Sequence, residues 1–130
     1  MSIMRKEIRL SCIIIIATLF FSCVRSRGEV VIFNDAFFKQ WRRDKKGCGS
    51  FRANNFQLLI ENKTKIVGVD IRNIRSKLGA PEKKMNNGNW LYYLEGGIQC
   101  LGDSNIVDVK VLIVEIENQK NIIDLKVLVP

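Results

Sequence analysis

The sequence changes character within residues 70–93, which read DIRNIRSKLGAPEKKMNNGNWLYY. Its first part has the apolar spacing of a short helix, an i, i+3, i+7 stripe formed by Ile71, Ile74 and Leu78. Asp70 can cap this helix at its start, Gly79 can end it in the left-handed conformation, and Pro81 prevents continuation. The second part passes through Asn- and Gly-rich turn residues into an aromatic run. The stretch therefore predicts a capped helix followed by a strand at residues 90–94.

Upstream of this stretch, the sequence predicts two further helices. Asn34 can cap a helix over residues 35–43, which the Lys- and Gly-containing segment 45–49 ends. The aromatic residues of that helix share one face: Phe37, Phe38 and Trp41. A second helix is expected from residue 50 or 51 to residue 61. Its expected buried residues are Phe56, Leu59 and Ile60.

Downstream, the apolar spacing has a period of two, which is typical of strands. A long strand is predicted over residues 106–117. Its apolar residues change face halfway, which indicates either a bulge or coverage on both faces. A turn at residues 118–121 leads to a last strand over residues 122–129, where Asp124 and Lys126 lie opposite an apolar face. That face contains Ile123, Leu125, Val127 and Val129.

This order of elements, helices first and an antiparallel meander afterwards, defines the α+β class. Because the last strand has one apolar and one polar face, the helices are expected to pack on one face of a three- to four-stranded antiparallel sheet. With 130 residues in total, the chain has room for one folded domain, which is predicted over residues 32–130.

The central region also resembles a known family. The matching residues are Gly68-Val69-Asp70, Ile74, Leu78-Gly79-Ala80-Pro81, Trp90 and Tyr92-Tyr93. Together they look like the core pattern of the BamE (SmpA/OmlA-type) lipoprotein domain, in which a short capped helix leads into an aromatic strand of a three-stranded antiparallel sheet. The resemblance covers residues 66–93 and implies this fold, together with a role in outer-membrane protein assembly. The β-lactamase-inhibitor repeat has the same helix–helix–sheet shape.

The N-terminus has the pattern of an export signal. Basic residues precede an apolar run over residues 10–21, which is shorter than the ~20 residues that a membrane-spanning helix needs. The following Ser22-Cys23 resembles the lipobox of bacterial lipoproteins, in which the cysteine is acylated and becomes the mature N-terminus. The resemblance implies a signal peptide over residues 1–22, lipidation of Cys23 and a tether over residues 23–31. An ordinary signal peptide without lipid and an uncleaved anchor are the alternatives.

The residues after Cys23 bear on the final location. They contain neither an Asp directly after the cysteine nor an acidic cluster. By resemblance to lipoprotein sorting signals, this pattern implies attachment to the outer membrane of a Gram-negative bacterium, with the domain facing the periplasm. Removal of the signal peptide leaves 18 basic and 12 acidic residues, a net charge of +6.

The cysteines are consistent with export. Of the four, Cys12 leaves with the signal peptide and Cys23 would carry the lipid. Cys48 and Cys100 remain in an oxidising compartment, where cysteine pairs persist as disulfides, so a bond between them is predicted. Two unpaired buried thiols are the alternative. Two thiols without histidine cannot complete a tetrahedral zinc site.

The composition argues against an enzyme. The chain contains no histidine, which excludes every mechanism that uses an imidazole base or ligand. The carboxylate pairs Glu115/Glu117 and Asp103/Asp108 fall where solvated strand faces or loops are expected. No catalytic residue, cofactor or metal site is therefore predicted. Export also argues against nucleic acid as a partner.

The function predicted instead is a protein-binding or scaffolding module of the cell envelope, with an inhibitor of a periplasmic enzyme as the alternative. The candidate partner-binding residues are Trp90, Tyr93, Arg42 and Arg43, because interface hot spots favour Trp, Tyr and Arg. Strand alternation places Trp90 and Tyr93 on opposite faces, so at least one of the aromatic residues is expected to face solvent or a partner. The basic run 42–46, with Arg52 nearby, could bind anionic lipid headgroups or an acidic protein, or it could simply be the solvated end of a helix.

Overall fold

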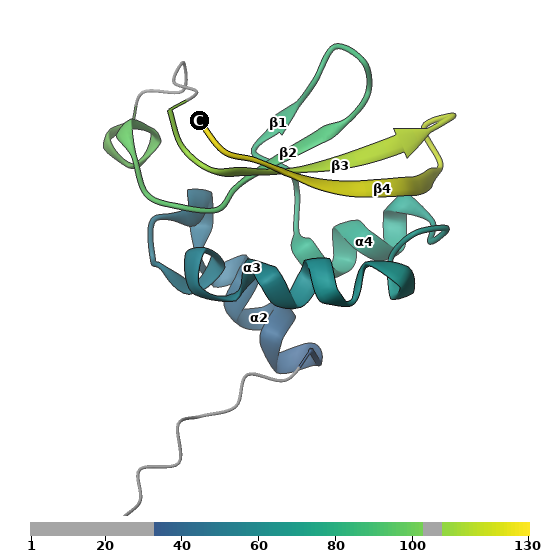
Figure 1. Cartoon of the computed structure of the whole chain (residues 1–130), viewed down its shortest axis with the longest axis horizontal. Coiled ribbons are helices and arrows are strands. Elements are labelled where there is room, and N and C mark those ends of the chain that lie inside the picture. The colour runs from purple at the N-terminus through teal and green to yellow at the C-terminus, as the bar shows by residue number, and fades with distance from the viewer. Residues whose placement is uncertain (1–32, 103–107) are drawn as a thin grey trace, which may run out of the picture. The chain divides into compact units, whose positions relative to one another are not determined.

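The structure is a computed structural model that describes residues 33–102 and 108–130. The predictions for Cys23, the signal peptide and the tether lie outside these residues, as does the first part of the strand predicted over residues 106–117. Within the described residues, three α-helices precede a four-stranded antiparallel sheet, and the helices cover one face of that sheet (Figure 1). The predicted α+β class is therefore confirmed.

The three α-helices begin and end close to the predicted positions. They are α2 (Asp35–Arg43), α3 (Phe51–Glu61) and α4 (Ile71–Leu78). The side chain of Asn34 accepts a hydrogen bond from the backbone N–H of Phe37 at 3.1 Å, and that of Asp70 accepts one from Arg72 at 2.8 Å. Both predicted N-caps are confirmed. Gly79 has a φ of +82° as expected, but its ψ of −178° lies outside the left-handed helical region, so the chain leaves α4 in an extended direction.

The sheet has the strand order β1-β2-β3-β4, so both of its hairpin turns lie at the same end. The strands are β1 (Lys83–Lys84), β2 (Trp90–Tyr93), β3 (Val111–Glu117) and β4 (Asn121–Leu128). The two-residue β1 was not predicted individually, because two residues show no period. The strand predicted over residues 106–117 begins only at Val111, since residues 108–110 are described and do not form part of a strand.

The change of face within β3 comes from coverage on both sides. Every residue of β3 from Val111 to Val114 is buried. A bulge also exists, but its extra residue lies in β4, because Glu115 pairs with Asp124 while the next residue, Ile116, pairs with Ile122. Ile123 is the residue left over. Its predicted place on the apolar face is therefore wrong, and Ile122 points into the core instead.

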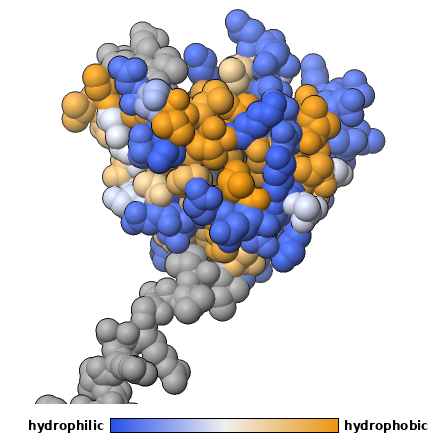
Figure 2. All heavy atoms as spheres, viewed as in Figure 1, coloured by the Kyte–Doolittle hydropathy of each residue, from blue (hydrophilic) through white to orange (hydrophobic). Residues whose placement is uncertain are grey.

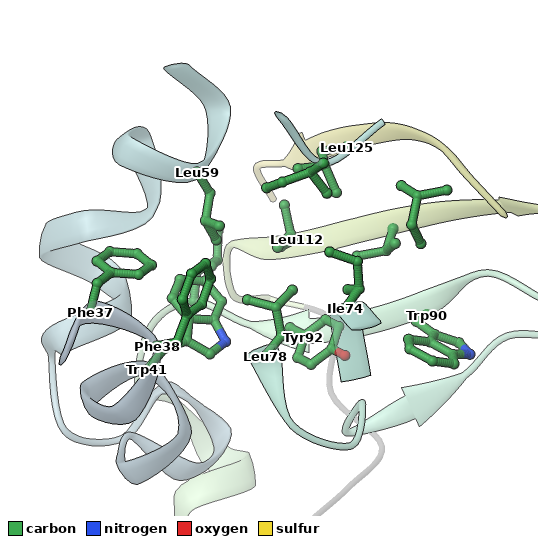
Figure 3. Packing of buried hydrophobic residues seen from close by; sticks show 14 residues of the cluster. Phe37, Phe38, Trp41, Leu59, Ile74, Leu78, Trp90, Tyr92, Leu112 and Leu125 are labelled. Atoms are coloured by element: carbon green, nitrogen blue, oxygen red, sulfur yellow. The ribbon is translucent and has the colours of Figure 1, made fainter. Parts of the chain in front are cut away.

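The main core lies between the helices and the sheet. Side chains from α2, α3 and α4 point toward those of β2, β3 and β4 (Figure 3). Its most deeply buried members include Phe37, Trp41, Leu59, Leu78, Tyr92 and Leu112. In α3, only Leu59 of the three expected residues is fully buried, while Phe56 and Ile60 are half-buried.

A smaller cluster covers the opposite face of the sheet. It contains Tyr93, Val109, Val111 and Ile113, with Met85 and Leu91 packed against it. The members of this cluster that lie in β2 and β3 alternate with members of the main core, so they point to the other side of the sheet. Part of the sheet is therefore apolar on both faces.

Candidate functional site

The predicted aromatic candidates are not exposed. Only 5% of Trp90 and 8% of Tyr93 is accessible to solvent. Trp90 belongs to the main core and Tyr93 to the cluster on the opposite face, because apolar residues cover this part of the sheet on both sides. The expectation that at least one of these aromatic residues faces solvent is therefore wrong.

The predicted basic candidates, Arg42 and Arg43, are both exposed at the end of α2. Arg42 has a definite structural role. Its Nη1 donates hydrogen bonds to the backbone oxygens of Ser76 at 3.2 Å and Lys77 at 2.7 Å. These oxygens belong to the last turn of α4, whose carbonyl groups have no partner within the helix. Arg42 therefore fastens α2 to the end of α4.

A buried ion pair links the helices to the sheet, and the expectation that Arg52 adds to the exposed basic run is therefore wrong. Only 2% of Arg52 is exposed, and its Nη1 lies 2.9 Å and 3.1 Å from the two carboxylate oxygens of Glu82. The same nitrogen donates to the backbone oxygen of Tyr93 at 3.1 Å, and Nε donates to that of Trp41 at 3.2 Å. The guanidinium carbon also lies 5.1 Å from the centre of the Trp41 ring. One arginine thus connects α3, the end of α2 and β2.

Two carboxylates complete this network through the backbone. Glu82 accepts hydrogen bonds from the N–H groups of Tyr93 at 3.1 Å and Lys46 at 3.3 Å. Asp44, which is also buried, accepts from the N–H groups of Gly49 and Arg52. Ser50 makes no side-chain cap, so Asp44 caps the start of α3 from a distance. These hydrogen bonds connect α2, α3 and β2, so the network has a structural role.

The cysteine pair lies beside this network. Cys48 and Cys100 have their Cα atoms 5.8 Å apart and their sulfur atoms at disulfide-bonding distance. The bond connects the end of η1 (Lys45–Gly47) to η3 (Ile98–Leu101), so it ties the loop between two helices to the chain that follows β2. The structure therefore contains the pair that the sequence predicts.

A cleft of about 540 Å³ lies between the two hairpin turns. Lys84 and Trp90 contribute to its lining, and Figure 3 shows the indole nitrogen of Trp90 pointing away from the other labelled core residues. Four amide side chains surround it: Asn86, Asn87, Asn118 and Gln119. No carboxylate occurs among the described residues that line the cleft. Its polar groups can form hydrogen bonds with a ligand, but they include no acid–base pair.

The outer edge of β4 is partly open. Near the start of the strand, Gly68 donates a backbone hydrogen bond to Ile122 at 2.7 Å, and Ile122 donates one to Val69 at 3.0 Å. From Asp124 onward, no described backbone group pairs with the outer side of the strand. Three large apolar residues on β4 and just after it are exposed: Ile123 by 46%, Leu128 by 53% and Val129 by 68%. Figure 2 shows apolar side chains along β4 and between β4 and α3.

Residues 33–102 and 108–130 contain no group of three or more acidic, cysteine or histidine side chains placed to bind a metal ion. No helix in this part of the chain has both the length and the apolar character needed to cross a membrane.

The chain matches no protein-family model, no curated protein and no solved structure with which it was compared. Its fold and contacts define the class of protein: an α+β domain with a disulfide and a buried Arg–Glu pair. The resemblance to the BamE-like domain stays a prediction from residues 66–93.

Proposed function

We propose that this chain is a non-catalytic, lipid-anchored binding module, which holds a partner protein at the periplasmic side of the outer membrane. The export signal ending at Ser22-Cys23 and the BamE-like pattern of residues 66–93 support the location and the class. The observation that carries the binding role is the open outer edge of β4 with its exposed apolar residues.

An open edge strand can pair with an extended segment of another protein. The partner would supply main-chain hydrogen bonds to β4 from Asp124 onward, and its side chains would contact Leu128 and Ile123. Exposed apolar residues beside such an edge favour a protein as the occupant, because burying them on binding is favourable. Trp90 and Tyr93 are unsuitable as interface anchors, since both are already buried.

The arrangement of charged groups supports binding over catalysis. The chain has no histidine. The most buried carboxylates, Asp44 and Glu82, are occupied by backbone N–H groups and by Arg52. A hydrolase that uses carboxylates would need one of them free to accept or deliver a proton at a substrate.

Photo-crosslinking in the cell envelope tests this proposal. A photoreactive amino acid replaces Leu128 in one full-length chain and Gln57, which is exposed on α3, in the control. We expect one discrete crosslinked protein from position 128 and none from position 57. Introducing Ile123→Lys into the first chain should lower the yield severalfold, because a charge then lies beside the bound strand. The crosslinked product should enter the detergent phase, whereas a Cys23→Ser chain should stay in the aqueous phase.

Three results would contradict the proposal. They are equal crosslinking from both positions, an unlipidated wild-type chain, and turnover of an envelope substrate by the purified protein. If the crosslinked partner is a periplasmic hydrolase whose activity falls on binding, the result supports the alternative function of an inhibitor.

A further inference from the structure

The helices α2 and α4 lie side by side and expose mainly basic side chains. Their contact includes the hydrogen bonds from Arg42 to the end of α4 and the ammonium group of Lys77, which lies 4.8 Å from the centre of the Phe38 ring. We call their exposed basic residues the basic helical face. It consists of Lys39, Arg42, Arg43, Arg72, Arg75 and Lys77.

Few acidic groups neutralise this face. α2 contains one acidic residue, Asp35, and α4 contains none. Among the described residues, only Arg72 of the six has a carboxylate within salt-bridge distance, that of Asp70 at 3.1 Å. The hydrogen bond from Arg72 lowers the pKa of Asp70. The six basic residues outnumber the two acidic residues Asp35 and Asp70, so the basic helical face carries a net positive charge.

The position of this face fits a membrane as its partner. The described chain starts at Phe33, directly before α2, and ten peptide units separate that residue from Cys23. A fully extended chain of that length spans at most about 35 Å. A lipid on Cys23 would therefore hold the start of α2 within that distance of the bilayer surface.

We propose that the basic helical face binds the anionic phospholipid headgroups of the membrane that anchors the chain. The choice of membrane rests on the lipidation proposed above, while the attraction itself rests on the charges of α2 and α4. Basic residues close to an anionic bilayer are attracted to it, and the attraction falls off within a Debye length. Such binding orients the domain with α2 and α4 on the lipid, and it leaves β4 accessible to a protein partner.

Vesicle sedimentation tests this binding directly. The described residues have their own hydrophobic core and disulfide, so the mature chain can be studied without lipid as a Cys23→Ser variant. We expect it to sediment with vesicles of phosphatidylcholine and phosphatidylglycerol but not with phosphatidylcholine alone. Raising the salt concentration from about 0.1 M to about 1 M should release it, because the Debye length falls from about 10 Å to about 3 Å.

A pair of charge-reversed variants distinguishes binding through the basic helical face from an effect of the protein's net charge. Lys39→Glu/Arg43→Glu alters the basic helical face, and Lys83→Glu/Lys84→Glu makes the same change in net charge on β1, where both lysines are exposed. The first variant should bind anionic vesicles at least about tenfold more weakly than the unaltered chain, and the second should bind within about twofold of it. Thermal unfolding of each variant confirms that the fold is retained.

Absence of binding to the phosphatidylglycerol vesicles would overturn the inference and favour an acidic protein as the occupant of this face. Equal losses in the two charge-reversed variants would also overturn it, because net charge alone would then explain binding. Both outcomes leave the crosslinking from Leu128 unaffected, so failure of this inference is distinguishable from failure of the proposed function.

Discussion

Arg52 shows how much one buried residue contributes to this fold. Its guanidinium group donates hydrogen bonds to the carboxylate of Glu82 and to the backbone oxygens of Trp41 and Tyr93. A buried charge is costly unless it is paired and hydrogen-bonded, and here both conditions are met. The spacing of the sequence contains a signal for its burial, because Arg52, Phe56 and Leu59 follow an i, i+4, i+7 pattern. An arginine in such a stripe is easily assigned to the solvent.

Replacing this arginine tests the assignment. Arg52→Met should lower the free energy of unfolding by about 3–5 kcal/mol, because it leaves Glu82 without its cation and two carbonyl groups without donors. Lys126→Met is the matched control, since it removes an ion pair of Glu115 in which the lysine side chain is 53% exposed. That change should cost at most about 1 kcal/mol. Urea unfolding measures both values, and similar small losses in the two variants would contradict a structural role for the buried pair.

At the scale of the elements, η1 and η3 are short segments held in place by close contacts. A Cβ atom on Gly47 would lie 2.9 Å from the backbone nitrogen of Glu95, and the φ of this glycine is +70°. Only glycine allows η1 to approach the chain after β2 this closely. The Cys48–Cys100 bond then joins the two segments across a sequence separation of 52. Steric and covalent constraints therefore act at this corner together with the hydrogen bond from Lys46 to Glu82.

Removing the disulfide should therefore affect stability strongly. Cys48→Ala/Cys100→Ala should lower the free energy of unfolding by up to about 4 kcal/mol, since the open chain gains loop entropy in the unfolded state. Urea unfolding of the oxidised protein and of the double variant measures this difference. Reduced wild-type protein should unfold at the same urea concentration as the variant. Labelling of two free thiols in the exported protein would contradict the bond.

For the whole molecule, stability at alkaline pH should depend on Tyr92. Its ring is fully buried, and its hydroxyl group donates a hydrogen bond to the backbone oxygen of Gly79 at 2.9 Å. Burial raises the pKa of Tyr92 well above its usual value of 10.0. The folded state therefore keeps the phenol neutral at pH values where the unfolded chain ionises. This contribution is complete below pH 10 and is lost as the pH rises toward the folded-state pKa.

The Tyr92→Phe variant separates this effect from general alkaline unfolding. At neutral pH it should be less stable than the wild type by about 1 kcal/mol, because the hydrogen bond to Gly79 is missing. Above about pH 10, its free energy of unfolding should fall less steeply than that of the wild type. Urea unfolding across this pH range measures both slopes, and equal slopes would contradict ionisation of Tyr92 as a cause.

The local features of this protein could be predicted from its amino-acid sequence. The Asn34 and Asp70 caps, the three helices and the α+β class follow from short-range spacing and from the chemistry of single residues, which act within a few positions along the chain. The Cys48–Cys100 pair followed from counting cysteines and from the export signal. Trp90 was predicted as a binding residue because of its residue type, but its burial depends on residues that are distant in the sequence.

The burial of individual residues and the position of the free surfaces could be read only from the folded structure. A second apolar cluster covers the opposite face of the sheet and buries Tyr93, and an extra residue in β4 turns Ile122 inward and Ile123 outward. The contact between Arg52 and Glu82 joins residues 30 positions apart, and the basic helical face exists because α2 packs beside α4. These features depend on packing between distant segments, since burial is a property of the neighbours in space and strand alternation cannot reveal a bulge.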